Sequence, residues 1–218
     1  MDRLPLRLAR RALLVAAVAA ALPLLTLRVA AAEPATAAAE ALVRDLAEGA
    51  WNLLHRTDLD QRQRLDQLVE LLEAKTDVPL LSRLALGRHW QRLSAPQQAR
   101  YEQLFGQVVM GSLARRLDQY VSGAGGTLDD HLRFVASQPV GKDDVLVRTK
   151  VSTQQGDVVD VDWRLRGREQ PVILDLVIEG ASLLVTQRSE FATVIERSDV
   201  DGLLAELSAR AGAGSADS

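Results

Sequence analysis

Apolar residues in the first half of the chain recur with the period of about 3.6 residues that marks an amphipathic helix. The repeating positions are Leu42, Leu46, Ala50, Leu53 and Leu54, and after a short interval Leu65, Leu68, Val69 and Leu72. Charged residues lie opposite the second set, so this helix is expected to bury one face. The residues Arg56 to Asp58 separate the two segments and predict a break between two helices.

Start signals predict two further helices before the middle of the chain. Asp77 can cap a helix that carries Pro79 in its first turn. Ser94 and Gln97 have the spacing of a capping box, and they precede the longest apolar stripe in the sequence. This stripe consists of Tyr101, Leu104, Phe105, Val108, Ser112, Leu113, Leu117 and Tyr120. The glycine-rich segment 122–126 follows it and is expected to be a flexible turn.

In the second half of the chain the apolar period changes from 3.6 to 2, which predicts β-strands. Short turns join four expected strands, which lie within residues 131–139, 145–152, 159–166 and 171–180. Such a meander forms an antiparallel sheet with one buried face. The alternating rows of the two middle strands are Val145, Val147, Thr149 and Val151, and Val159, Val161, Trp163 and Leu165. In the last strand, Asp175 is expected to share a face with Ile173 and Val177.

The stretch DLVIEGASLLVTQRSEF, residues 175–191, interrupts the last strand. Its first apolar run ends at Ile178, the residues Glu-Gly-Ala-Ser follow, and a second apolar run begins at Leu183. Because glycine inside a strand pattern indicates a bulge or a bend, we expect one long strand that is bent in its middle. Two short helices are predicted after it, in EFATVIER and in VDGLLAELSAR, and residues 212–218 are expected to form a disordered tail.

The order of these elements predicts an α+β fold, in which N-terminal helices pack on an antiparallel sheet of about four strands and C-terminal helices close it. A bent sheet is concave, so an apolar cavity is expected between the sheet and the helices. The residues expected to line this cavity are Leu84, Leu104, Phe105, Val108, Val145, Val147, Val151, Val159, Val161, Trp163, Leu176 and Ile178.

The N-terminus has the pattern of a secretory signal peptide. Four arginines precede residues 12–27, which are uncharged and mostly apolar, and Ala30 to Ala32 supply the small residues of a cleavage site. A membrane anchor is the alternative, but the apolar run is shorter than the ~20 residues that span a bilayer, and it contains Pro23. We therefore expect residues 1–32 to be removed on export, which leaves a single domain at residues 33–211.

Composition and charge exclude several classes of function. The chain has no cysteine, so disulfides, thiolate catalysis and zinc–thiolate sites are absent. The full chain has 26 basic and 29 acidic residues, and removal of residues 1–32 leaves 21 and 28, a net charge of −7. An acidic protein is not expected to bind nucleic acid, which favours a basic surface.

Few polar residues could carry chemistry. His55, His89 and His131 lack the spacing of a metal site, and the first two are expected at the surface. Asp175 could act as a general base beside a cavity, but the sequence gives it no second polar partner. We therefore expect no catalytic set, no metal site and no cofactor, and a cavity without catalytic groups favours binding of an apolar molecule.

Two polar residues near the end of the last strand have roles that the sequence leaves open. Arg188 can form a salt bridge with Asp199 or Glu190, or it can lie at the rim of the cavity and contact an anionic head group. Ser182 lies in the context G-A-S-L, which is not that of a nucleophilic serine, so a hydroxyl at a bend is the simpler interpretation.

Two separated segments resemble signatures of the toluene-tolerance, or MlaC, family of periplasmic phospholipid-binding proteins. In TDVPLLSRLALGRHWQRLSAPQQARYEQLF, the matching residues are Leu86, Gly87, Trp90, Ser94, Gln97 and Phe105. In the stretch 175–191, which continues through ATVIERSDVDGLLAEL, they are Asp175, Glu179, Gly180, Ser182, Leu183, Arg188 and Phe191. The two segments occur in the order that the family has, and the resemblance extends over residues 77–211.

The resemblance implies a periplasmic carrier, acting as a monomer, with phospholipid as its cargo. Its implied partners are an outer-membrane lipoprotein complex and an inner-membrane ABC transporter, in a system that maintains outer-membrane lipid asymmetry. The acyl chains are expected between the sheet and the helices, with the head group outside. Two other classes remain open: a small cavity enzyme, such as an isomerase or dehydratase with Asp175 as its lone acid, and a rigid adaptor with a filled core. Bound lipid in the purified protein separates the first class from both others.

Overall fold

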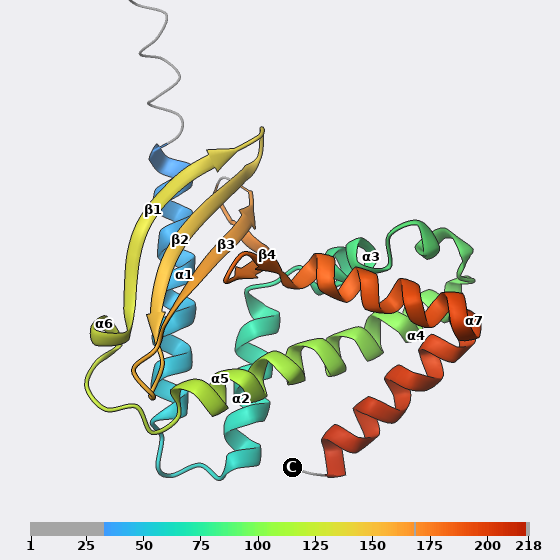
Figure 1. Ribbon diagram of the computed structural model, residues 1–218, viewed down its shortest axis with the longest axis horizontal. Coiled ribbons are helices and arrows are strands. Elements are labelled where there is room, and N and C mark those ends of the chain that lie inside the picture. Colours follow the sequence, from blue (N-terminus) through green and yellow to red (C-terminus); the bar gives the residue numbers. More distant parts are fainter. Residues whose placement is uncertain (1–32, 168, 217–218) are drawn as a thin grey trace, which may run out of the picture.

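Helices form the first part of the structure, a computed structural model that describes residues 33–167 and 169–216. The expected signal peptide at residues 1–32 lies outside the described residues. The helices are α1 (Glu33–Leu54), α2 (Gln61–Ala74), α3 (Val78–Leu86), the 3₁₀-helix η1 (Gly87–Arg92), α4 (Ala95–Phe105), the π-helix η2 (Gly106–Met110), α5 (Gly111–Val121) and α6 (Leu128–His131). Figure 1 shows α1 behind the sheet, and α3 and α4 on the other side of the molecule.

Two of these helices begin where the sequence places capping residues. Asp77 Oδ1 accepts a hydrogen bond from the Leu80 amide at 3.0 Å, and Gln97 Oε1 accepts one from the Ser94 amide at 2.9 Å. Such bonds give partners to amide groups at a helix start that have none within the helix. The predicted starts of α3 and α4 are therefore confirmed.

Helices α4 and α5 form one continuous rod through η2, because the residues at both ends of η2 keep helical backbone angles. A π-turn contains more residues than an α-helical turn, so it rotates the positions that follow it about the helix axis. The predicted apolar stripe is consequently buried as far as Val108, but it fails at its end. Tyr120 is 48% exposed, whereas Met110 and Ala114 are buried.

The second part of the chain forms one antiparallel sheet in the order β1-β2-β3-β4-β5. Its strands are β1 (Leu132–Val140), β2 (Asp144–Ser152), β3 (Val158–Arg166), β4 (Val172–Ile178) and β5 (Ala181–Ser182). The inner face carries the buried side chains of Val145, Val147 and Leu165, and the outer face carries ion pairs such as Arg148–Asp162. The predicted α+β fold class is confirmed.

The last long strand reverses its direction and does not simply bend. β4 ends at Ile178, and Glu179 and Gly180 form a tight turn with positive φ angles of 49° and 79°. β5 then pairs antiparallel with β4, and a helix begins at Leu183. The prediction of one long bent strand is therefore wrong. The glycine permits a reversal, and the apolar run after it is the first turn of a helix.

A bulge inside β4 changes which of its side chains face inward. Leu174 is an extra residue between two positions that remain paired with β3, so the alternation of the strand is shifted there. Ile173 and Leu176 are both buried on the inner face. Asp175 lies opposite Arg164 of the outer face, so it does not share the face of Ile173 as the sequence suggested.

Helix α7 (Leu183–Ala216) has two arms, because its backbone leaves the helical region at Ser198 and Asp199. This break separates the two C-terminal helices that the sequence predicts. The first arm begins at Leu183, earlier than predicted, and the second continues to Ala216, although the sequence suggested a disordered tail from residue 212. In Figure 1 the two arms form a V that packs against α3 and α4.

The buried apolar side chains form two clusters. The sheet-side cluster consists of Ala35, Ala39, Val43, Leu46, Ala50, Leu54, Leu68, Leu72, Met110, Ala114, Val145, Val147, Leu165, Ile173 and Leu176. The helical cluster consists of Ala85, Leu86, Leu93, Tyr101, Leu104, Phe105, Val108, Phe191, Ile195, Val200, Leu203 and Leu207. The α4–α5 rod contributes to both, since it runs across the molecule from one to the other (Figure 1).

The angle between the two arms of α7 depends on close packing of Gly202 against Ser198, where the helix is interrupted. A Cβ atom on Gly202 would lie 2.5 Å from Ser198 Cβ, so Gly202→Ala forces the turn to shift. We expect this variant to lose about 1–3 kcal/mol of unfolding free energy in urea titrations. Gly212→Ala is the matched control in the same helix, because no atom lies within 4 Å of its added Cβ. The control should be neutral or gain up to about 1 kcal/mol, and an equal loss in both variants would contradict the close packing.

Candidate functional site

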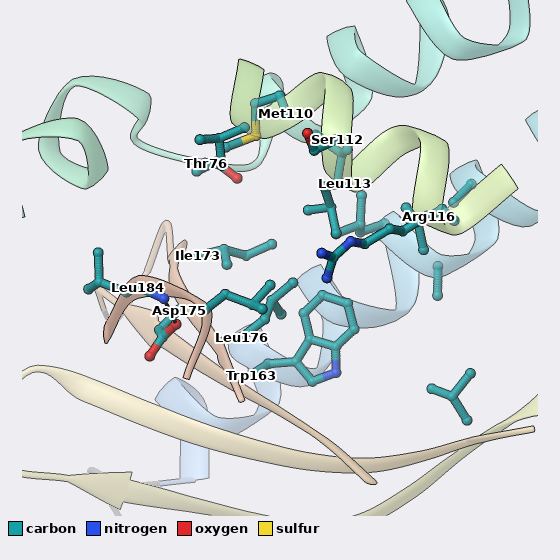
Figure 2. Close-up of a pocket in the computed structure, with 18 of the residues that line it drawn as sticks. Thr76, Met110, Ser112, Leu113, Arg116, Trp163, Ile173, Asp175, Leu176 and Leu184 are labelled. Carbon is teal, nitrogen blue, oxygen red and sulfur yellow. Dashed lines mark hydrogen bonds between the residues drawn. The ribbon is translucent and has the colours of Figure 1, made fainter. Parts of the chain in front are cut away.

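A cavity of about 340 Å³ lies between the two clusters. Its lining includes Leu46 and Leu176 from the sheet-side cluster, and Ala85 and Phe105 from the helical cluster. Most of the lining side chains are apolar, and the volume falls within the ~300–1,000 Å³ that is typical of ligand pockets. Figure 2 shows side chains of the α4–α5 rod on one side of this space and those of the sheet on the other.

Trp163 lines the cavity with its indole ring. The one polar atom of the ring, Nε1, has a hydrogen-bond partner within the sheet. Trp163 Nε1 donates a hydrogen bond to Thr149 Oγ1 at 3.0 Å, and Thr149 Oγ1 donates one to the Val161 carbonyl at 2.8 Å. A buried indole N–H costs free energy unless it has such a partner. The two bonds therefore fix the ring on the sheet side of the cavity, where Figure 2 shows it.

Some of the polar lining residues lie where the cavity meets solvent. Four lining residues are exposed, Arg116 on α5 and Thr186, Glu190 and Arg210 on α7, and together they define the mouth of the cavity. Glu190 Oε2 accepts a hydrogen bond from Gln187 Nε2 at 3.1 Å. The mouth thus lies between α5 and both arms of α7, and it carries charge of both signs.

Asp175 holds the start of α7 against β4. Its Oδ1 atom accepts a hydrogen bond from the Leu184 amide at 3.0 Å, and its Oδ2 atom accepts one from Ser182 Oγ at 2.5 Å. Ser182 Oγ in turn accepts from the Val185 amide at 3.0 Å. These are helix-capping bonds, since they satisfy amide groups of the first turn of α7. Asp175 lines the cavity, but its carboxylate is already engaged in this structural role.

His131 joins two loops at another part of the cavity lining. Its Nδ1 atom lies 2.9 Å from the Ser152 carbonyl, and its Nε2 atom lies 2.8 Å from the Gly125 carbonyl. Carbonyl oxygens only accept hydrogen bonds, so the ring donates to both only when it is protonated. The Ser152 carbonyl, followed by the Gly125 carbonyl, raises the pKa of His131 above its ordinary value of 6.5. The imidazolium form thus ties the glycine-rich turn to the end of β2.

The other two histidines have different surroundings. The ring of His55 stacks on Trp51 with centroids 4.1 Å apart, and its nitrogens lie 2.8 Å from the carbonyls of Trp51 and Ala124. His89 is buried, although a surface position was expected. Burial, and then the neighbouring cations of Arg88 and Arg92, lower the pKa of His89 below 6.5. His89 lies in η1 and does not line the cavity.

The structure brings some of the predicted lining residues together and places the others elsewhere. Phe105, Val151, Trp163 and Leu176 line the cavity. The remaining residues lie outside it; they are Leu84, Leu104, Val108, Val145, Val147, Val159, Val161 and Ile178.

Val145 and Val147 are buried but lie away from the cavity because α1 packs directly on their part of the sheet. The small side chains of Ala35 and Ala39 allow this close approach, and all four residues belong to the sheet-side cluster. Leu104 and Val108 point into the helical cluster, on a different side of the rod. Knowing which side chains lie on the inner face of the sheet was therefore not sufficient to locate the cavity.

In the described part of the chain, Arg188 forms a salt bridge with neither Asp199 nor Glu190. Its Nε and Nη2 atoms donate hydrogen bonds to the Leu84 carbonyl at 2.9 and 2.6 Å. This carbonyl lies in the last turn of α3, where helix carbonyls lack partners within the helix. Asp199, the suggested partner, pairs with Arg92 at 3.5 Å. Arg188 is not among the residues that line the cavity; it joins the first arm of α7 to α3.

Sequence reasoning missed the wall that α1 and α5 supply. Leu46, Ala50 and Trp51 of α1 line the cavity, as do Leu113 and Arg116 of α5. The helical period marked Leu46, Ala50 and Leu113 as buried positions, so a signal for their burial was present. No sequence pattern indicated Arg116, because a charged residue in an amphipathic helix is normally assigned to the solvent face.

Among the described residues, no helix combines the length and apolarity that crossing a membrane requires. In the same part of the chain, no group of three or more His, Asp or Glu side chains is placed to hold a metal ion.

The contacts of His131 predict a pH dependence of stability. A folded-state pKa above 6.5 means that proton binding favours the folded protein. The contribution is complete below pH 6.5 and is lost as the pH rises through the folded-state pKa. We expect the difference in unfolding free energy between the wild type and His131→Gln to be largest in acid and to shrink above pH 6.5. Urea titrations across this range measure it, and a pH-independent difference would contradict the assignment.

Comparisons with known proteins give one matching family model and a solved structure of similar fold. The family model described as MlaC protein matches residues 45–209. The fold is similar to that of a phospholipid-binding protein from Ralstonia solanacearum, whose structure was solved in complex with a phospholipid. The two chains share 22% sequence identity with a TM-score of 0.64, over 83% of this chain and 98% of the other. The search of curated proteins found no match. Because the family model covers well over half of the sequence, the chain belongs to the MlaC protein family.

Proposed function

We propose that this protein is a periplasmic phospholipid carrier and not an enzyme. It takes up lipid from one membrane-bound partner and releases it to another, and these partners are an outer-membrane lipoprotein complex and an inner-membrane ABC transporter. Its transport maintains the lipid asymmetry of the outer membrane. In this proposal residues 1–32 are a signal peptide, residues 33–211 form a single lipid-binding domain, and the carrier acts as a monomer without a cofactor.

The observation that carries the proposal is the apolar cavity between the two clusters, with its exposed charged groups gathered at the mouth. This arrangement suits a ligand with a long apolar part and a polar end. Membership of the MlaC family, and a fold similar to that of a phospholipid-binding protein, support the same class of ligand. We propose that acyl chains contact Phe105, Val151, Trp163 and Leu176, which the sequence indicated, and Leu113, which it did not.

The energetics of lipid transfer explain why a carrier with such a cavity is needed. At ~0.8 kcal/mol per buried methylene, exposing two acyl chains of roughly 30 methylenes to water costs about 24 kcal/mol. Free diffusion through an aqueous compartment is therefore negligible. A cavity that approaches the apolarity of the bilayer removes most of this cost, and contact with a partner can then release the lipid.

The main alternative, a small cavity enzyme, requires an acid or base that is free to act on a substrate. Asp175 is the carboxylate that the sequence suggested for this role, and it accepts bonds from Ser182 Oγ and from the Leu184 amide. A general base must be within hydrogen-bond reach of the proton that it removes. A carboxylate that caps α7 is poorly suited to this task, which supports a carrier over an enzyme.

Filling the cavity gives a direct test of the carrier function. Leu113 is half-buried and lines the cavity, so we expect the indole of Leu113→Trp to occupy the acyl-chain space. This variant should keep its melting temperature close to that of lipid-free wild type but carry much less phospholipid. Lipid extraction and mass spectrometry of the purified proteins measure the cargo.

Leu165→Trp is the control, because Leu165 is fully buried in the sheet-side cluster and does not line the cavity. Overpacking a filled core costs about 1–3 kcal/mol, so this variant should lose stability. Wild-type protein that copurifies with no phospholipid, and takes none from vesicles, would exclude the carrier function.

A further inference from the structure

The mouth of the cavity contains a cationic side chain without a protein partner. Arg116 is exposed and lines the cavity from α5. Among the described residues, no hydrogen bond or ion pair is formed by its guanidinium. Figure 2 shows this group pointing inward from α5, between Leu113 and the indole of Trp163. A guanidinium directed into an apolar-lined space, with no carboxylate to meet it, has five hydrogen-bond donors available for a ligand.

The anionic groups of the lining do not neutralise Arg116. Asp175 is engaged with Ser182 and with the first turn of α7, and Glu190 accepts from Gln187. Neither carboxylate forms a salt bridge with the Arg116 guanidinium in the described part of the chain. By contrast, Arg64, Arg83 and Arg148 each meet a carboxylate. Arg62, Arg133 and Arg210 likewise form no ion pair among the described residues, but of these only Arg210, on the second arm of α7, also lines the cavity.

The position of Arg116 matches the boundary between the two parts of an amphipathic ligand. Its side chain extends from α5 past Leu113 toward Trp163, and the residue as a whole remains exposed to solvent. A phospholipid has its phosphodiester at the corresponding boundary, between the acyl chains and the rest of the head group. Guanidinium groups bind phosphate oxygens through two parallel N–H···O bonds, which adds orientation as well as affinity.

We infer that Arg116 binds the phosphodiester of the phospholipid and thereby sets the direction in which the lipid enters the cavity. The inference rests on the proposed carrier function and adds its head-group contact. Arg188, the residue that the sequence suggested for this role, is bonded to the Leu84 carbonyl instead. The contact makes the site selective for acyl lipids that carry an anionic phosphate over neutral lipids with the same chains.

The test compares Arg116→Gln with Arg115→Gln. Both variants remove one positive charge from the exposed side of α5, but Arg115 does not line the cavity and instead donates a hydrogen bond to Ser112 Oγ at 3.3 Å. Lipid-free proteins are offered vesicles that contain either phosphatidylglycerol or the diacylglycerol with the same acyl chains. Loss of one charge-assisted contact should weaken phosphatidylglycerol uptake by Arg116→Gln about tenfold, or about 1.4 kcal/mol. Its diacylglycerol uptake, and both uptakes of Arg115→Gln, should match the wild type.

A second variant and a second probe keep the test decisive. Arg116→Lys keeps the charge but lacks the two-bond fork, so its phosphatidylglycerol uptake should lie between those of the wild type and Arg116→Gln. Melting curves of all the proteins show whether any substitution impairs folding. Arg116→Lys provides a second test of the contact if Arg116→Gln does not fold. Titration with inorganic phosphate shows whether Arg116 binds free phosphate instead of the phosphate group of a lipid. Phosphate binding that Arg116→Gln abolishes, without a change in lipid uptake, would overturn the inference.

Failure of this inference can be told apart from failure of the carrier function. If the wild type takes up neither lipid, the carrier function itself is excluded. If the wild type takes up phosphatidylglycerol and both glutamine variants do so equally well, the carrier function stands and the role of Arg116 is excluded.

Discussion

The cavity exists because the apolar side chains of this chain pack as two clusters that share one helical rod. As far as Val108, in the middle of η2, the rod directs Tyr101, Leu104 and Val108 into the helical cluster. From Met110, the last residue of η2, the rod faces the other way, and Met110 and Ala114 belong to the sheet-side cluster. A continuous rod has no loop at this junction with which to bring the clusters together. The space between them is therefore left for a ligand, although protein interiors are otherwise close-packed.

Local signals were sufficient for much of the fold. Asp77 and Ser94 mark helix starts through bonds within one turn, and the period of 2 identifies the strands and the inner face that carries Val147. Such features depend on neighbours that are close in sequence. The sequence also marked a change of direction at Gly180, but a glycine permits a bend and a reversal equally well, so the hairpin could not be distinguished from a bent strand.

The position of the cavity could not be predicted in the same way, because it depends on which elements touch. Val145, Val147 and Val151 belong to one alternating row of β2, and Trp163 belongs to the neighbouring row of β3. Yet α1 covers Val145 and Val147, whereas Val151 and Trp163 line the cavity. The π-turn also rotates the helix positions that follow it, and no residue type in the sequence predicts a π-turn. Arg188 and Arg116 show the consequence for the site: the arginine in the family signature is bonded to a helix end, and one from an ordinary polar face points into the cavity.

A carrier must hold its lipid without binding it so tightly that it cannot be released. Under the proposed function, the apolar lining meets the first requirement and the polar groups at the mouth meet the second. The apolar lining does little more than replace the bilayer, since moving a methylene between two apolar surroundings changes its free energy little compared with exposure to water. Polar contacts at the mouth differ between carrier and membrane, so they can decide which lipid enters and how it is oriented. In the proposed function, exposed contacts are also accessible to a membrane-bound partner, whereas the bonds of Asp175 attach α7 to β4. Under the proposed function, release then requires a change at the exposed mouth and leaves the two clusters intact.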